Sequence, residues 1–342
     1  MMLMQWEKIK VMQSAPPILF EDRTMSVRIS DTIGRKRTVT PMVEPRSFGK
    51  RATNSKTRRA FLTAAAGILS TVTNNCPILH ASSLPAAQRS FRWCVFYGTT
   101  TDEATLKTYD LVVLDPGYKG SISQITCTGT KVCGYLSLGE IRTTDPFLEL
   151  LDPAALLPEN PDWPGIRRVD IRHPSWRSLV LERIPSLETQ AFTGLMLDTL
   201  DTPPYLELLD PTRYRGMREA AVELVGCIRR RWPGMMLIMN RGYALLPDVV
   251  QNIDAVIAES LLTSPDQKTG KISWLDSSQV ESQLALLYPV ASRRPPVPIL
   301  SLDYWDPGDA RSIAEIYRRE RLIGHHPYVA TRLLDQIVPE GR

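Results

Sequence analysis

The stretch that decides the fold is GLMLDTLD, residues 194–201. An apolar, strand-like run from Gly194 to Leu197 leads directly into Asp198, and a second acid, Asp201, follows three positions later. Asp is common in turns and at helix N-termini, so this segment alone predicts only a strand followed by a turn. A buried carboxylate without a partner is costly, which favours a second interpretation, an acid placed at the rim of a barrel for chemistry. The surrounding sequence distinguishes between the two.

Seven similar apolar runs occupy residues 91–342. They are FRWCVFY (91–97), LVVLD (111–115), KVCGYLSLGE (131–140), MMLIMN (235–240), AVIAES (255–260), VPILSLDY (297–304) and HPYVAT (326–331). Continuous rather than alternating runs are typical of parallel strands buried on both faces. Eight such strands with intervening helices over about 250 residues predict a (β/α)8 TIM barrel.

The segments between the strands support this rhythm. Helices are expected over 175–190, 211–231, 247–252, 277–288 and 307–323, whereas residues 100–108 and 120–126 are weak helix formers. An open doubly wound sheet that binds a dinucleotide would have a Gly-rich turn after its first strand, and YGTT at 97–100 does not supply one. Residues 141–174, rich in Pro, Asp and Trp, interrupt the rhythm on the side of the third strand where active-site loops of barrels lie.

The beginning of the chain has the features of an export signal. TRRAFL at 57–62 matches a twin-arginine signal, and the apolar stretch 60–72 is shorter than the roughly 20 residues that span a bilayer. We expect residues 57–87 to be a signal peptide recognised by the Tat translocon, with cleavage near Ala87 or, alternatively, Ala81. The competing interpretation is a short buried helix after a basic tail.

Residues 1–56 predict a poorly structured basic leader, and translation is expected to start downstream, at Met25 or Met42. The mature protein is therefore expected in the periplasm or outside a bacterial cell, with no stable membrane anchor after cleavage. The barrel domain is expected over residues 91–342.

Charge is divided unevenly along the chain. Residues 1–90 carry 14 Lys and Arg against 5 Asp and Glu, whereas residues 91–342 carry 27 against 32, a balance of −5. A mildly acidic body argues against nucleic acid as a partner and suits a neutral or cationic ligand.

Cysteine and histidine usage bears on metals and disulfides. Four cysteines follow the signal segment, namely Cys94, Cys127, Cys133 and Cys227. Cys127 and Cys133 are close enough in sequence to pair in an oxidising compartment, and buried free thiols are the alternative. Because no C-x-x-C pair exists and only four His occur, we expect no metal site and no cofactor.

Polar residues end most of the predicted strands. In chain order these are Tyr97, Asp115, Glu140, Asp198, Asn240 with Arg241, Glu259, and Asp303 with Tyr304. Five carboxylates at one rim would repel one another, which raises at least one pKa and provides an acid near neutral pH. Paired carboxylates without a His cluster indicate cleavage of a glycosidic bond. Among the tryptophans near loops, Trp163, Trp176, Trp274 and Trp305, the last is the one selected as a sugar-stacking residue.

Six segments together resemble a known family. They are GYLSLGE (134–140), DIRHPSW (170–176), GLMLDTLD (194–201), NRGYALLP (240–247), AVIAESLLT (255–263) and LSLDYWD (300–306). In their order and spacing, across about 92–335, they resemble the endo-α-1,4-polygalactosaminidases, glycoside hydrolase family 114, a TIM-barrel family.

The resemblance implies a catalytic pair and a substrate. Asp198 and Glu259 match the catalytic pair of this family, which implies a retaining mechanism. We assign Asp198 as nucleophile and Glu259 as general acid/base, with an exchange of the two roles left open. The substrate would be an α-1,4-linked galactosamine-containing polysaccharide, whose free amines are cationic and suit a carboxylate-lined pocket. Residues assigned to substrate binding are Tyr97, Asp115, Glu140, Asn240, Asp303, Tyr304 and Trp305.

Several neighbouring residues stay open. Asp201 is expected as a helix cap or loop residue, with substrate binding as the alternative, and Arg241 is expected to pair with an acid of the pocket. Asp170 and Arg172 either hold the long loop or bind substrate. Two other functions are compatible with the sequence: a non-catalytic carbohydrate-binding barrel, and a glycosidase of this fold that acts on a different glycan.

Overall fold

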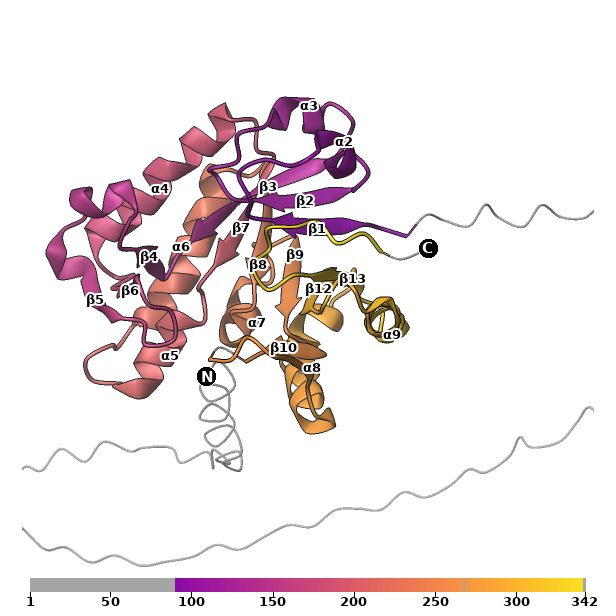
Figure 1. Ribbon diagram of the computed structural model, residues 1–342. Coiled ribbons are helices and arrows are strands. Elements are labelled where there is room, and N and C mark those ends of the chain that lie inside the picture. The colour runs from indigo at the N-terminus through magenta and orange to yellow at the C-terminus, as the bar shows by residue number, and fades with distance from the viewer. Residues whose placement is uncertain (1–89, 267, 341–342) are drawn as a thin grey trace, which may run out of the picture. The chain divides into compact units, whose positions relative to one another are not determined.

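The barrel wall consists of eight parallel strands, each formed from one of the predicted apolar runs (Figure 1). The computed structural model describes residues 90–266 and 268–340, so the predicted leader and signal peptide lie outside the described residues. The strands are β1 (Trp93–Phe96), β2 (Leu111–Leu114), β3 (Lys131–Ser137), β7 (Gly194–Asp198), β8 (Met236–Asn240), β9 (Ala255–Glu259), β12 (Ile299–Tyr304) and β13 (His326–Ala330), hydrogen-bonded in that order. The predicted TIM barrel is confirmed, with the ring nearly closed.

Side chains join the first and last strands of the ring. Trp93 Nε1 on β1 donates a 2.8 Å hydrogen bond to the carbonyl of His326 on β13. The rings of Trp93 and Tyr328 pack with centroids 5.8 Å apart. These contacts bring β1 beside β13, as a barrel requires.

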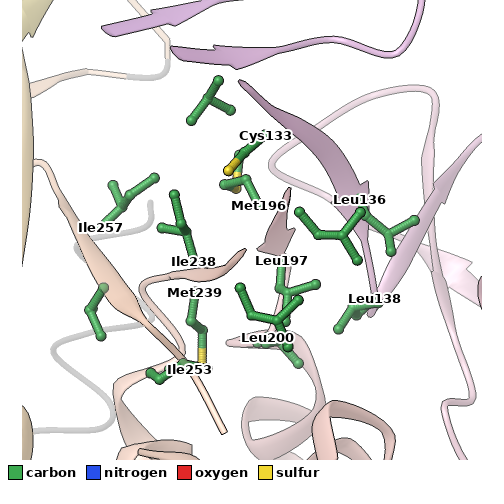
Figure 2. Close-up of a cluster of buried hydrophobic side chains, with 14 of the residues drawn as sticks. Cys133, Leu136, Leu138, Met196, Leu197, Leu200, Ile238, Met239, Ile253 and Ile257 are labelled. Atoms are coloured by element: carbon green, nitrogen blue, oxygen red, sulfur yellow. The ribbon is translucent and has the colours of Figure 1, made fainter. Parts of the chain in front are cut away.

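The side chains of each strand pack alternately on the inner and the outer face of the barrel wall. Successive side chains of a strand point to opposite faces, so on β7 Met196 shares the face of Asp198 whereas Leu197 lies on the other. Side chains from β3, β7, β8 and β9 pack together in this core (Figure 2). At Gly194 a Cβ atom would lie 2.6 Å from both Cys133 Sγ and the Met236 carbonyl, so only glycine fits where these three strands meet.

Helices follow most strands, as predicted, although their bounds differ. They are α2 (Glu103–Leu106), α3 (Ile122–Thr126), α4 (Pro174–Thr189), α5 (Thr202–Leu209), α6 (Met217–Arg231), α7 (Leu246–Val249), α8 (Ser277–Ala291) and α9 (Ala310–Leu322). The helix expected over 211–231 begins only at Met217, because Gly216 is left-handed with φ 82° and starts the helix there. In the described part of the chain no helix has the length and apolarity needed to cross a membrane.

The long excursion after β3 forms a small antiparallel sheet beside α4 and α5 (Figure 1). Its strands are β4 (Glu140–Arg142), β5 (Leu156–Glu159) and β6 (Ile166–Val169), with the short 3-10 helices η1 (Pro146–Leu150) and η2 (Pro153–Ala155) between β4 and β5. The prediction that strand three runs to Glu140 is wrong at its end. The strand stops at Ser137, whose hydroxyl donates to the Glu140 carbonyl at 2.7 Å and closes a turn.

Asp170 and Arg172 hold this excursion in place. Arg172 Nη2 lies 2.7 Å from Asp170 Oδ2, and Arg172 Nη1 donates to the carbonyls of Arg213 and Arg215 at 3.3 and 2.7 Å. Of the two roles left open by the sequence, the structure thus places both residues in the loop-holding one.

A hairpin, β10 (Thr263–Pro265) and β11 (Ile272–Trp274), follows β9.

Candidate active site

Four polar side chains meet at the carboxyl ends of the strands. Asn240 Nδ2, at the end of β8, donates to Asp198 Oδ1 and to Glu259 Oε2, each at 2.9 Å. The Tyr304 hydroxyl, at the end of β12, donates to Glu259 Oε1 at 2.7 Å. The structure therefore brings together residues that lie more than a hundred positions apart in sequence.

The shared amide nitrogen limits the separation of the two acids. Because Asp198 Oδ1 and Glu259 Oε2 each lie 2.9 Å from the same atom, these two oxygens are at most 5.8 Å apart. Retaining glycosidases hold their carboxyl groups about 5–5.5 Å apart, whereas inverting enzymes need about 6.5–9.5 Å for a water molecule. The bound on the nearest oxygens is compatible with the shorter separation.

Two further tyrosines line the Asp198 side of the site. The Tyr135 hydroxyl, on β3, donates a hydrogen bond to the Asp198 carboxylate. The Tyr97 ring packs edge-on against Tyr135 with centroids 5.5 Å apart. Tyr97 was assigned from the sequence, but Tyr135 was missed. Tyr135 lies two residues before Ser137, which pairs with Asp198, and so shares its inward face. This register belongs to the folded sheet, so the segment alone does not reveal which way Tyr135 points.

The charges of the site are closely coupled. Burial, followed by the charge of Glu259, raises the pKa of Asp198 to about 6, although the Asn240 hydrogen bond opposes the shift. Burial also raises the pKa of Tyr135 and Tyr304 well above their ordinary value, so both hydroxyls remain donors at neutral pH. Within residues 90–266 and 268–340, neither Asp198 nor Glu259 has a Lys, Arg or His nitrogen within 4.0 Å of its carboxylate.

The chain turns sharply after each of the three adjacent strands β7, β8 and β9. Thr199, Arg241 and Ser260 follow Asp198, Asn240 and Glu259, and have φ of 61°, 49° and 56°. Non-glycine residues seldom adopt this left-handed region, and such strain concentrates at functional sites. Thr199 is held there by its hydroxyl, which donates to the Asp198 carbonyl at 2.6 Å and accepts from Gly139 N at 2.7 Å. The strand ends are therefore fixed by their loops.

Arg241 pairs with an acid, as expected, and that acid is Asp201. Arg241 Nε donates to Asp201 Oδ2 at 3.1 Å, and Gly242 N donates to Asp201 Oδ1 at 3.2 Å. Asp201 directly precedes α5, but its side chain makes no capping hydrogen bond. It is a loop residue whose side chain joins two loops.

Glu140 lies beside the barrel strands, in a buried network of the small sheet. Its Oε1 accepts from Asn160 Nδ2 at 2.9 Å and from Thr202 Oγ1 at 2.8 Å, and Arg168 Nε lies 4.0 Å away. Burial raises the pKa of Glu140. These contacts link β4 to α5. The Glu140 side chain therefore stabilises the packing of the small sheet, and Glu140 is not the last residue of strand three.

Asp115 lies at the end of β2, near the rim. Its Oδ1 accepts from Gly117 N at 2.7 Å, and its Oδ2 is 3.9 Å from Arg142 Nη2. The side chain is one-quarter exposed, which leaves it accessible to a ligand.

Asp303 is not in the site, in contrast to its assignment from the sequence. It is fully buried, and its Oδ1 accepts from Leu262 N at 2.9 Å, from Thr263 N at 2.7 Å and from Thr263 Oγ1 at 3.1 Å. Since Tyr304 points inward, its neighbour Asp303 must face the outer side of the barrel wall. It anchors the start of the β10–β11 hairpin.

Trp305, Trp176 and Trp163 differ in burial and in the groups that they contact. Trp305 packs on Trp274 of the hairpin, with ring centroids 5.4 Å apart, and its Nε1 donates to Asp309 at 3.0 Å. Trp176 is fully buried and donates to the Leu138 carbonyl at 2.9 Å, whereas Trp163 is 40% exposed. The contacts of Trp305 thus join the hairpin to α9, and among the described residues Trp305 makes no hydrogen bond with Asp198 or Glu259.

The described residues contain neither a metal-binding cluster nor a disulfide. Among the described residues, no cluster of three or more His, Cys, Asp or Glu has the arrangement to hold a metal ion. Cys94, Cys127, Cys133 and Cys227 are free thiols, with Cys127 exposed and Cys133 buried. Of the two cysteine alternatives, the structure has the free-thiol form.

Comparison with known proteins places this site in context. The family model described as glycoside-hydrolase family GH114 matches residues 73–340. An uncharacterized protein of Deinococcus radiodurans is 24% identical over 292 residues, which cover 77% of this chain and 87% of the relative. An uncharacterized protein of Thermotoga maritima is 24% identical over 187 residues, 52% of this chain and 57% of the relative.

Two solved structures share the fold. The glycoside hydrolase domain of PelA from Pseudomonas aeruginosa is 25% identical with a TM-score of 0.64, covering 73% of this chain and 98% of that domain. Ega3 of Aspergillus fumigatus, solved in complex with galactosamine, is 14% identical with a TM-score of 0.56, covering 73% of this chain and 94% of Ega3. The second likeness is one of fold alone.

Proposed function

The chain belongs to glycoside-hydrolase family GH114, and we propose that it is an exported enzyme that cleaves an α-1,4-linked galactosamine-containing polysaccharide with retention of configuration. The observation that carries the mechanism is the single Asn240 nitrogen that contacts both Asp198 and Glu259 at 2.9 Å. It supports a carboxylate spacing suited to a covalent intermediate.

Asp198 and Glu259 divide the chemistry between them. In the first step Asp198 attacks the anomeric carbon while Glu259 gives its proton to the departing glycosidic oxygen, so that the carbon–oxygen bond breaks and a glycosyl–Asp198 ester forms. In the second step Glu259 takes a proton from water, whose oxygen attacks the same carbon and releases Asp198. Both residues return to their starting states.

The neighbouring side chains assist each step. Asn240 donates to Asp198 and so favours its ionised form. The Tyr304 hydroxyl fixes one oxygen of Glu259, which leaves the other carboxyl oxygen near Asn240 and the substrate. Tyr135 provides a second hydrogen bond to Asp198. A nucleophile held by two donors loses less entropy on reaching its attack geometry.

The charge of the site supports a cationic glycan. Asp198 and Glu259 lack a cationic partner within 4.0 Å among the described residues, and Asp115 stands partly exposed at the rim. The ammonium group of a galactosamine unit would provide the missing positive charge through charge-assisted hydrogen bonds. The crystallised complex of Ega3 with galactosamine, a protein of the same fold, supports this choice of sugar.

The cellular part of the proposal rests on the leader. TRRAFL at 57–62 and the apolar stretch after it support export through the Tat translocon to the periplasm or beyond. A polysaccharide outside the cytoplasm would then be the natural partner.

The test is cleavage of partly deacetylated α-1,4-galactosaminan by four proteins. We expect wild type to release oligosaccharides, Asp198→Asn and Glu259→Gln to release almost none, and Glu223→Gln to match wild type. Glu223 is a suitable control because its side chain is 58% exposed and pairs with Arg177 on the helical surface. No release by wild type would refute the substrate, and undiminished release by both site variants would refute the residue assignment. A panel of other glycans then identifies an alternative substrate.

A further inference from the structure

The ion pair between Asp201 and Arg241 links the carboxyl ends of β7, β8 and β9. Arg241 Nε contacts Asp201 Oδ2 at 3.1 Å, and Arg241 Nη1 donates to the backbone carbonyl of Glu259 at 3.0 Å. We infer that Asp201 and Arg241 are positioning residues that hold Glu259 in register with Asp198. The effect on rate rests on the proposed function, whereas the effect on the place of Glu259 does not.

The burial of Arg241 explains why it needs Asp201. The Arg241 side chain is 10% exposed and that of Asp201 is 43% exposed. A buried charge is tolerated only when it is paired and hydrogen-bonded. Burial alone would lower the pKa of Arg241, but the adjacent Asp201 charge reverses this and raises it, so the guanidinium stays charged. Among the described residues, Asp201 is the one carboxylate within 4.0 Å of it.

The backbone couples this ion pair to the reacting groups. Arg241 and Gly242 are both left-handed, with φ of 49° and 59°. This turn follows Asn240 directly, so the Asn240 amide faces the two carboxylates while the next side chain reaches Asp201. The Gly242 N–H also binds Asp201, at 3.2 Å. Any movement of Arg241 is therefore transmitted to Asn240 on one side and to the Glu259 carbonyl on the other.

The presence of Asp201 also determines which carboxylate forms an ion pair with Arg241. The charge of Glu259 acts on Arg241, although the hydrogen bond between them goes to the backbone carbonyl oxygen of Glu259. Without the charge of Asp201, the guanidinium would be drawn to Glu259, whose charge already acts on it. An Arg241–Glu259 pair would pull the Glu259 side chain away from Tyr304 and Asn240, and would stop it from acting as a proton donor.

Asp201→Asn tests this directly, because the amide keeps the size of the side chain and an oxygen for the Gly242 N–H. We expect kcat on the galactosaminan to fall roughly tenfold to a hundredfold, with KM within about threefold of wild type because ground-state binding is retained. The matched control is Asp248→Asn, which breaks the Arg218–Asp248 ion pair on the surface, whose side chains are 41% and 45% exposed. It is expected to retain the kcat of wild type.

A crystal structure of Asp201→Asn gives a readout that needs no turnover. The inference predicts that Glu259 leaves Tyr304 and turns toward Arg241. It is overturned if Glu259 keeps its contacts with Tyr304 and Asn240, or if kcat stays at the wild-type level while only thermal stability falls. If wild type cleaves no glycan, the proposed function fails, but the position of Glu259 in the variant still decides the inference.

Discussion

Asp303 and Tyr304 are consecutive residues of β12, yet they serve opposite faces of the barrel wall. Tyr304 donates to Glu259 Oε1 inside the site at 2.7 Å, whereas Asp303 accepts from the Leu262 and Thr263 amides outside it. The two-residue period of a strand produces this division. It also means that the two positions should respond differently to substitution.

Tyr304→Phe should impair catalysis with little loss of stability. The change removes the hydrogen bond to Glu259 but keeps the ring in a largely buried place. A hydrogen bond to the neutral, proton-donating form of Glu259 contributes about 0.5–1.5 kcal/mol, which corresponds to a fall in kcat of about twofold to tenfold. Steady-state kinetics together with thermal unfolding measure both effects. An unchanged kcat would show that Tyr304 does not orient Glu259.

Asp303→Ala should instead destabilise the fold. It leaves the amides of Leu262 and Thr263 buried without an acceptor, at about 1–3 kcal/mol for each group. Asp303→Asn should cost less, because the amide oxygen replaces the acceptor. The free energy of unfolding from urea titrations gives the comparison. Equal losses in both variants would contradict the anchoring role.

The same residue predicts a pH dependence of stability. Burial, followed by the charge of Glu320, raises the pKa of Asp303 well above its ordinary value. A raised folded-state pKa means that the stabilising contribution is present at low pH, below the unfolded-state pKa, and is lost as pH rises through the folded-state pKa. Because Asn does not ionise, Asp303→Asn should gain stability relative to wild type as pH increases. A difference that is constant with pH would argue against a raised pKa.

The pH–rate profile should identify the role of Asp198. Its pKa of about 6 implies that a nucleophilic Asp198 is ionised above pH 6, so kcat/KM should rise with pH through this value. If the two roles are exchanged and Asp198 is the proton donor, kcat/KM should fall through the same value. Asn240→Ala removes a hydrogen bond that lowers this pKa. The rise or fall of kcat/KM should therefore occur at a higher pH in this variant.

The sequence predicted the strands well because parallel strands buried on both faces are continuous apolar runs. Their carboxyl ends were harder to predict. The run through Glu140 hides a turn closed by the Ser137 hydroxyl, and the run through Tyr304 does not reveal which of its last two residues faces inward. Facing is fixed by register with neighbouring strands, which pairs Ser137 with Asp198. That relationship is tertiary and is not written in either segment.

The proposed catalytic pair was accessible to sequence analysis, whereas the residues that contact the pair were only partly so. Asp198 and Glu259 end strands that can be recognised one at a time. Tyr135 lies within a strand, where a tyrosine is more often ordinary packing. The link from Asp201 to Arg241 spans 40 residues and depends on two consecutive left-handed positions. Only the folded barrel places these groups together.

The thiols should differ sharply in reactivity. Cys127 is exposed, whereas Cys133 is buried and burial raises the pKa of its thiol. An alkylating reagent should therefore modify Cys127 in the native protein and Cys133 only after unfolding. Mass spectrometry of the labelled peptides identifies which cysteines have been alkylated. A native protein in which neither residue reacts until a reductant is added would instead indicate a Cys127–Cys133 disulfide.

The central claim is tested most directly by trapping the glycosyl–enzyme intermediate. Glu259→Gln should be mixed with an α-galactosaminide that carries a good leaving group, because bond cleavage then needs no acid whereas release of the intermediate still needs a base. Mass spectrometry of the protein and its peptides should find one galactosaminyl unit attached to Asp198. Attachment to another residue, or turnover that produces the inverted sugar with no adduct, would contradict the account.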